Sequence, residues 1–461
     1  MRLSELRNKK IILLGFGREG IDTFHFLRES FPQKIFGIGD RLELEKFEPK
    51  VINLLKKDRK ITLHLGKNYL KFLKNYDIII KSPGIPPKVL LPFLSKKQKI
   101  VTQTDIFFAN CPTKIIGITG TKGKSTSSRA VYHVLKKGGL KVKLVGNIET
   151  PALSFLKNLD RKTIFVYELS SFQLQNLKMS PQYAILLNIF PDHLDYHSNF
   201  KEYLESKENI FKYQKSKDYL IFNRENPLSR KMAKKGRAQK FSFGLSFKKE
   251  PGCFLKNNWI YYFSFTKKEE KILEKKKIKL TGDFNLLNVM PAILLGKIFN
   301  LPTKKIAKAL EGFKGAPHRL EFIGNYRGIK FYDDSAATVP QATQIAIETM
   351  EDSLFSLITG GSEKNLSFKR LAQKIVKSQI KILIFLPITG QKIWQAIKKE
   401  QKNTKIKSFF VNSMEEAVKI AYSQTPKGKI CLLSCASASF GLFKNYKERG
   451  NLFKKYVKKY G

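Results

Sequence analysis

Gly117-Ile118-Thr119-Gly120-Thr121-Lys122-Gly123-Lys124-Ser125-Thr126 is the stretch that decides the fold of this chain. It follows the apolar pair Ile115-Ile116 and precedes a helical pattern over residues 128–137, so we predict a strand, a glycine-rich turn and a helix. Such a turn lets backbone N–H groups converge on an anion, and the helix N-terminus adds partial positive charge. The stretch therefore predicts a binding site for nucleotide phosphates.

Two side chains of the turn carry chemistry in this prediction. Lys124 is placed to reach the outer phosphates, and the hydroxyl of Ser125 is placed to hold Mg²⁺. The strict phosphate-loop pattern has glycine where this chain has Ile118, so a Gly/Ser-rich surface turn is the alternative interpretation. The ATP-binding residues predicted in the loop are Gly120, Thr121, Lys122, Gly123, Lys124, Ser125, Thr126 and Ser127.

The composition is that of a globular protein. With 461 residues, the chain is long enough for roughly three domains. The hydrophobic fraction of 42% argues against disorder, and the four cysteines form no Cys-x-x-Cys pair, which favours reduced thiols in a cytoplasm. Apolar runs such as residues 382–388 are far shorter than the roughly 18 residues of a membrane span. We therefore expect a soluble, cytoplasmic protein without a membrane span, and we expect a monomer.

The formal net charge of +48 raises nucleic acid as a possible partner. The basic residues are spread over the whole length, in runs such as Glu274-Lys275-Lys276-Lys277 that are typical of solvated faces, and no nucleic-acid-reading motif is present. We expect no nucleic-acid partner. A basic ATPase that binds nucleic acid stays as an alternative, and it predicts ATP hydrolysis that DNA or RNA stimulates.

The first segment predicts a second nucleotide site. A short apolar strand over residues 10–14 leads into Gly15-Phe16-Gly17-Arg18-Glu19-Gly20, a helical pattern follows over residues 21–28, and Asp40 follows a strand over residues 34–38. This Gly-x-Gly-x-x-Gly context predicts a Rossmann-like domain with a pyrophosphate at the helix start. This pattern fits a dinucleotide-dependent dehydrogenase, and it also fits an enzyme whose substrate is any nucleoside diphosphate conjugate. A strand over residues 76–81 ends in Ser82-Pro83-Gly84, at the same ligand edge.

Polar residues also follow two later strands of the central segment. A strand over residues 163–167 ends at Glu168, where an acid across from a phosphate loop is a usual second ligand of Mg²⁺. A strand over residues 183–189 leads to His193, for which we predict a metal or substrate role, whereas we expect His197 at the surface.

The rest of the chain carries weaker signals. A helix over residues 199–212 contains Lys207, residues 216–281 are strand-like, and Asn285 and Asn288 are interpreted as helix-cap residues. In the last segment, strands over residues 329–332, 354–359 and 430–433 each end in polar residues, so we expect them to share one ligand edge. A final helix is expected from Phe440.

The order of four motifs resembles the Mur ligases of peptidoglycan synthesis: Gly120 to Ser125, Glu168 to Gln173, Asp192 to Asp195, and Asn285-x-x-Asn288. The resemblance covers essentially the whole chain. It implies an α/β protein that forms an amide bond with ATP through an acyl phosphate. It also implies three domains: a Rossmann-like domain for the UDP substrate at 1–109, a central P-loop-type ATPase domain with a mostly parallel sheet at 110–315, and a Rossmann-like α/β domain for the amino acid at 316–461.

The resemblance also implies roles for individual residues. Lys124 would bind the ATP phosphates, Ser125 and Glu168 one Mg²⁺, and Glu168 with His193 a second Mg²⁺. Lys207 matches a lysine that CO₂ converts to a carbamate, which helps to support the second metal. Further ATP-binding residues would be Asn285, Arg319 and Asp334, and the UDP-substrate-binding residues would be Gly17, Arg18, Asp40, Arg41, Ser82, Pro83, Gly84 and Asn147.

The tail is similar to that of the family members that add D-glutamate to UDP-N-acetylmuramoyl-L-alanine. The similarity lies in residues 432–440 and 443–450, and the D-glutamate-binding residues it implies are Thr338, Lys364, Ser439, Phe440 and Tyr446. Ala336 stands where many relatives have lysine, and Ser434-Cys435-Ala436 replaces the usual Ser-Pro-Ala. Another Mur ligase or a folylpolyglutamate synthase is the alternative within the same superfamily. Closure of the last domain about residues 315–317 is expected on substrate binding.

Overall fold

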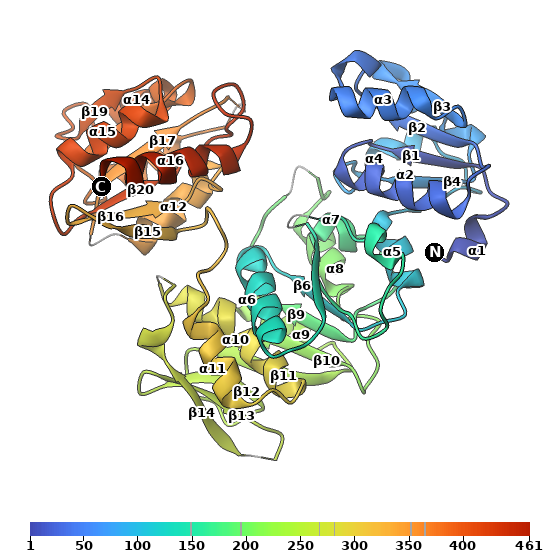
Figure 1. Cartoon of the computed structure of the whole chain (residues 1–461), viewed down its shortest axis with the longest axis horizontal. Helices are drawn as coiled ribbons and strands as arrows, with labels where there is room; N and C mark the ends of the chain where they lie inside the picture. The colour runs from blue at the N-terminus through green and yellow to red at the C-terminus, as the bar shows by residue number, and fades with distance from the viewer. Residues whose placement is uncertain (148–149, 194–195, 267, 281, 351–352, 364–365) are drawn as a thin grey trace. The chain divides into compact units, whose positions relative to one another are not determined.

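The structure is a computed structural model that describes residues 1–147, 150–193, 196–266, 268–280, 282–350, 353–363 and 366–461 (Figure 1). Its internal contacts divide the chain into two compact units. The first comprises Met1–Ile278 with Phe284–Phe313, and the second comprises Lys279–Asp283 with Lys314–Gly461. The first unit contains two β-sheets and the second contains one. The domain boundaries expected at residues 110 and 316 stay predictions.

The first sheet has five parallel strands in the order β3-β2-β1-β4-β5. Its central strand β1 is apolar and buried throughout, as expected of a parallel strand that is covered on both faces. The order changes direction between β1 and β4, which is where open α/β sheets bind ligands. The elements are β1 (Ile11–Leu14), β2 (Phe36–Asp40), β3 (Ile61–Leu65), β4 (Ile78–Lys81), β5 (Lys99–Val101), α1 (Leu3–Leu6), α2 (Arg18–Ser30), α3 (Pro49–Lys57), α4 (Pro87–Leu90) and α5 (Gln103–Asn110).

The second sheet has nine strands in the order β14-β13-β12-β11-β10-β9-β6-β8-β7. The strands from β12 to β7 are parallel, and β13 and β14 extend the sheet as antiparallel strands. The strands are β6 (Ile115–Thr119), β7 (Val142–Gly146), β8 (Ile164–Glu168), β9 (Tyr183–Leu186), β10 (Tyr219–Asn223), β11 (Gln239–Gly244), β12 (Gly252–Lys256), β13 (Trp259–Phe263) and β14 (Glu269–Glu274). The helices are α6 (Lys124–Lys137), α7 (Ser171–Leu174), α8 (Phe200–Glu208), α9 (Pro227–Ala233), α10 (Phe284–Ile298) and α11 (Thr303–Glu311).

The third sheet has six strands in the order β15-β16-β20-β17-β18-β19, and only the edge strand β15 is antiparallel to its neighbour. Its elements are β15 (Glu321–Tyr326), β16 (Ile329–Asp333), β17 (Leu354–Gly360), β18 (Ile382–Leu386), β19 (Lys407–Phe410), β20 (Ile430–Leu433), α12 (Pro340–Thr349), α13 (Lys369–Val376), α14 (Thr389–Glu400), α15 (Met414–Gln424) and α16 (Tyr446–Tyr460).

The predicted fold class is confirmed, because the chain folds into α/β sheets that are mostly parallel. Two local predictions were wrong. The final helix α16 begins at Tyr446 rather than Phe440, because the side chain of Asn445 caps it by accepting from the backbone N–H groups of Lys447 and Glu448. The strand-like region 216–281 also contains α9, which Asn226 caps and which has a proline in its first turn.

We find no helix among the described residues with the length and apolar character that a membrane span requires.

Candidate nucleotide and metal site

The phosphate loop joins β6 to α6, as the sequence predicts. Gly123 has φ of +90° and Lys124 is the first residue of α6, so the loop turns sharply into the helix N-terminus. A Cβ on Gly123 would lie 2.3 Å from Oδ1 of Asn288 on α10, which leaves no room for a side chain. The first turn of α6 therefore starts directly at the loop, in the geometry that favours phosphate binding.

Lys124 and Thr121 are held by the loop and its surroundings. Nζ of Lys124 donates to the carbonyl oxygens of Gly120 at 2.8 Å and Thr121 at 3.1 Å, so the ammonium lies over the loop. The hydroxyl of Thr121 is within 2.7 Å of the Tyr203 hydroxyl on α8. Lys122 is exposed, and its Nζ lies 3.7 Å from Oδ2 of Asp192. The loop thus brings two ammonium groups to the end of β6.

Glu168 is the residue whose environment best fits a metal ligand. It ends β8, which pairs with β6, and its side chain is only 2% exposed. Oε1 accepts from Nδ2 of Asn147 at 3.3 Å, but the buried Oε2 has no hydrogen-bond partner in the described part of the chain. A buried carboxylate oxygen without a partner is costly, and a bound cation would offset that cost. The environment of Glu168 therefore fits a ligand of Mg²⁺.

His193 follows β9, the other neighbour of β6. It adopts a left-handed backbone conformation with φ of +55°, and its side chain is exposed. Its ring makes an edge contact with Phe172, with 4.8 Å between the ring centroids. The ends of β8, β6 and β9 are thus adjacent, as the sequence analysis expected.

Lys207 lies beneath the phosphate loop. It is 1% exposed, and its Nζ donates to the carbonyl of Gly120 at 3.0 Å and to Oγ1 of Thr119 at 3.4 Å. Oγ1 of Thr119 in turn donates to the carbonyl of Leu169, the residue after Glu168. Burial and the neighbouring Lys124 ammonium hold the pKa of Lys207 well below its usual value, and Asp192 opposes this effect. No local sequence pattern indicates this burial.

The surface position expected for His197 is wrong. The residue is fully buried, and its Nε2 lies 3.0 Å from Oγ of Ser171 at the start of α7. Its ring also packs against Tyr203. His197 therefore supports the α7 and α8 region from inside.

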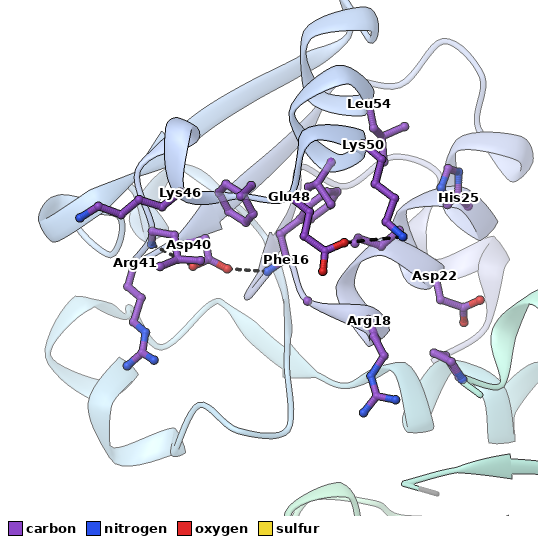
Figure 2. A pocket seen from close by; sticks show the side chains of 16 residues that line it. Phe16, Arg18, Asp22, His25, Asp40, Arg41, Lys46, Glu48, Lys50 and Leu54 are labelled. Atoms are coloured by element: carbon purple, nitrogen blue, oxygen red, sulfur yellow. Dashed lines mark hydrogen bonds and ion pairs between the residues drawn. The ribbon is translucent and has the colours of Figure 1, made fainter. Parts of the chain in front are cut away.

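A pocket of about 1130 Å³ lies at the carboxyl ends of β1 and β2 (Figure 2). Gly17, Arg18, Asp40 and Arg41 line it, which brings together half of the predicted UDP-substrate residues. The carboxylate of Asp40 accepts from the backbone N–H groups of Phe16 at 2.7 Å and Leu42 at 3.0 Å. Asp40 therefore holds the two loops of the pocket together, and the guanidinium groups of Arg18 and Arg41 extend from them (Figure 2).

The other four predicted UDP-substrate residues do not line this pocket. Ser82, Pro83 and Gly84 follow β4, on the other side of β1. Oγ of Ser82 donates to the carbonyl of Gly15 at 3.3 Å, which ties this turn to the glycine-rich loop. Asn147 follows β7 and contacts Glu168 instead.

In the second unit, three strand ends meet as predicted. Asp334 N donates to the Leu433 carbonyl, and Ser434 N donates to the Ile358 carbonyl, so the ends of β16, β20 and β17 are joined. Asp334 is buried, and its carboxylate accepts from Oγ of Ser434 at 2.8 Å and from the backbone N–H of Leu320 at 3.2 Å. Burial raises the pKa of Asp334 to about 7, although the nearby Arg319 lowers it.

The predicted D-glutamate residues that the structure describes lie around the same edge. Ser439 is buried after β20, Phe440 is 63% exposed, and Thr338 is half-buried after β16. Tyr446 begins α16, and its carbonyl accepts from Oγ of Ser335. The side chain of Arg449 on α16 is fully buried and donates to carbonyl oxygens of Ser335, Ser437 and Ala438, which fixes these loops. Lys364 lies outside the described residues.

Asn285 and Asn288, which the sequence pattern predicts as caps, lie in the first two turns of α10. Nδ2 of Asn288 donates to Oδ1 of Asn285 at 2.9 Å, and both residues are buried. Asn288 also faces Gly123 of the phosphate loop. Sequence reasoning missed this support, and also that of Tyr203, because each contact joins residues far apart in the chain.

Comparison with known proteins defines the family. Residues 118–296 match the Mur ligase middle domain. A relative from Clostridium botulinum (strain 657 / Type Ba4) is 35% identical over 98% of this chain and 97% of its own length, and one from Clostridium tetani (strain Massachusetts / E88) is 33% identical over 98% and 97%.

Solved structures agree in fold. A UDP-N-acetylmuramate-alanine ligase from Thermotoga maritima superposes with a TM-score of 0.57 at 18% identity, over 98% of this chain and 99% of that chain. A MurF ligase from Thermotoga maritima in complex with ADP superposes with a TM-score of 0.56 at 16% identity, over 99% and 97%.

The chain belongs to the Mur ligase family, whose members are ATP-dependent amide ligases of peptidoglycan synthesis and use Mg²⁺. The two Clostridium relatives described above, which match this chain along nearly its whole length, are both named UDP-N-acetylmuramoylalanine--D-glutamate ligase.

Proposed function

We propose that this chain joins D-glutamate to the L-alanine carboxylate of UDP-N-acetylmuramoyl-L-alanine with cleavage of ATP to ADP and phosphate. The observation that carries this proposal is the match of 35% identity over 98% of the chain to relatives that bear this name. The pocket at the ends of β1 and β2 and the phosphate loop support the proposal, because they would serve as the two nucleotide sites that such a reaction needs.

The first step would activate the carboxylate. A carboxylate oxygen attacks the γ-phosphorus of ATP, which forms an acyl phosphate and releases ADP. Lys124 and the N–H groups at the start of α6 would neutralise the charge that develops on the transferred phosphoryl group. Asn285 and Arg319 are the residues that we assign to the rest of ATP.

Ser125 and Glu168 would hold one Mg²⁺, and Glu168, His193 and a carbamate on Lys207 would hold a second. When bound, Mg²⁺ supplies positive charge that offsets the phosphate oxygens. The carbamate forms when the neutral amine of Lys207 adds to the carbon of CO₂ and loses one proton. The deep burial of Lys207 supports this assignment, because burial favours the neutral amine.

The second step would form the amide. The deprotonated amine of D-glutamate attacks the acyl carbon, and phosphate leaves. We assign Thr338, Ser439, Phe440 and Tyr446 to the bound D-glutamate, and we assign Lys364 to it on the sequence alone. The residues that hold D-glutamate contribute by alignment, which is worth up to about 7 to 11 kcal/mol in well-oriented reactions.

A phosphate-release assay tests this function. With ATP, Mg²⁺ and UDP-N-acetylmuramoyl-L-alanine, we expect D-glutamate to support turnover, and we expect L-glutamate, L-lysine and diaminopimelate to give background rates. As negative controls, we expect no binding of NAD and no stimulation of ATP cleavage by RNA or DNA. Preference for another amino acid would assign the chain to a different Mur ligase. We place this reaction in the cytoplasm, and we infer that the protein acts as a monomer.

A further inference from the structure

Lys81 is a buried lysine that the reaction outlined above does not use. It is the last residue of β4 and directly precedes Ser82-Pro83-Gly84, the turn that we assign to the UDP substrate. Its side chain is 2% exposed. Nζ donates to the hydroxyl of Tyr196 at 3.2 Å and makes a long contact of 3.5 Å with the Ser82 carbonyl.

Tyr196 links Lys81 to His193. The Tyr196 ring stacks on Phe172 with 3.9 Å between centroids and an interplanar angle of 27°, and Phe172 contacts the ring of His193. The Tyr196 hydroxyl also donates to the carbonyl of Ile85 at 3.3 Å. Lys81 and Ile85 lie on either side of the substrate turn, so Tyr196 is fastened to both ends of that turn.

Packing alone does not explain a charge at this position. The described structure shows no ion pair for Lys81, and burial lowers its pKa to about 8, with Asp105 and Glu19 opposing the shift. An ammonium that is buried without an ion pair is costly, and an apolar side chain of similar length would fill the space without that cost. A small cavity of about 10 Å³ beside Lys81 is lined by Glu19 and Gln103.

A second contact joins the same parts of the first unit. Nε2 of Gln173 donates to Oε1 of Glu19 at 2.8 Å, next to Arg18 of the glycine-rich loop. Oε1 of Gln173 accepts from the backbone N–H of Ser170 at 3.0 Å, two residues after Glu168. Glu168 and His193, the two proposed metal ligands that follow strands, are therefore both connected to loops that we assign to the UDP substrate.

We propose that Lys81 is a positioning residue of the ligase reaction, which holds Tyr196 and, through Phe172, sets His193 relative to the substrate turn at Ser82–Gly84. This inference rests on the proposed function, because that function gives His193 and the turn their roles. Lys81 contacts neither substrate nor phosphate in this account. Lys81 acts by fixing the distance between His193 and the substrate turn, the two groups to which the proposed function gives direct roles.

Lys81→Met tests the proposal, since methionine fills the space and removes the charge. We expect kcat to fall by about 10- to 100-fold, because small misplacements of reacting groups have effects of this size. We expect the KM for ATP to stay within about twofold, since the ATP-binding loop keeps its own contacts. The midpoint of thermal unfolding should stay equal or rise, which separates positioning from a structural role.

Tyr196→Phe provides the second arm. It removes the hydroxyl and keeps the ring that stacks on Phe172, so it should reproduce the loss of kcat, and the double variant should be no worse than either single variant. Calorimetric titration with UDP-N-acetylmuramoyl-L-alanine gives a readout without turnover, and we expect both variants to weaken binding equally. Lys34→Met is the matched control, because Nζ of Lys34 bonds to the carbonyls of Arg7 and Lys9, just before β1 begins, and makes no contact with the substrate turn in the described structure.

The outcomes separate the two proposals. Wild-type protein that releases no phosphate with D-glutamate would contradict the proposed function. An active wild type with unchanged kcat, KM and substrate binding in both variants would contradict the role of Lys81 alone. Additive losses in the double variant would show that Lys81 does not act through Tyr196. If Lys81→Met fails to fold, the kcat and substrate binding of Tyr196→Phe decide the question.

Discussion

Lys124→Ala is expected to lower D-glutamate-dependent phosphate release by about 10³-fold, which is the upper end of the range for loss of one preorganised charge-stabilising donor. The reason is the position of this side chain. Lys124 begins α6, and its ammonium lies over the phosphate loop, where it bonds to the carbonyl oxygens of Gly120 and Thr121. Removal of the ammonium leaves the charge that develops on the γ-phosphoryl group without the cation that the first residue of α6 supplies.

The fold should tolerate this change. Lys124 is half-buried, and alanine is a good helix former, so the thermal unfolding midpoint should shift little. Lys137→Ala at the exposed end of the same helix is the matched control and should keep wild-type turnover. ATP binding measured by calorimetry would show whether the loss lies in binding or in the chemical step. Turnover close to wild type in Lys124→Ala would remove the phosphate-loop assignment.

The parallel sheets could be predicted from the sequence because their strands are short apolar runs that end in polar or glycine-rich turns. β20 has the predicted bounds, Ile430–Leu433, and β6, β8 and β9 lie side by side as their polar ends suggested. The prediction is possible because parallel strands direct their carboxyl ends to one edge of the sheet. A motif that follows such a strand must therefore lie at that edge. The adjacency of Glu168 and the phosphate loop follows from that rule.

The supporting contacts could not be predicted, because no local pattern encodes them. Lys207 is one of many lysines on a polar helix, and only tertiary packing buries it beneath the loop. His197 was expected at the surface for the same reason, since its burial depends on α7, which lies earlier in the chain. Asn288 has the sequence context of a cap, and its contact with Gly123 crosses from α10 to the phosphate loop.

The second large effect is expected for Lys207→Ala, in combination with a chemical rescue. The variant should lose about 10²- to 10³-fold in kcat, because it lacks the carboxylate that we propose to support one Mg²⁺. It also leaves a space beneath the Gly120 carbonyl and the Thr119 hydroxyl, to which Nζ of Lys207 now donates. A short carboxylic acid such as formate or acetate fits the chemistry of the missing group. We expect each acid to restore part of the activity in a saturable way.

The rescue separates a carbamate from a simple cation. Sodium chloride at equal ionic strength should have no effect, and methylamine should rescue the variant only if the ammonium of Lys207 is what the reaction needs. The wild type gives an independent readout, because ¹³C-labelled CO₂ should produce a carbamate signal in the NMR spectrum that is absent from Lys207→Ala. Rescue by methylamine and no such signal would contradict the carbamate. It would leave Lys207 as a buried cation that, with Lys124, offsets phosphate charge from beneath the loop.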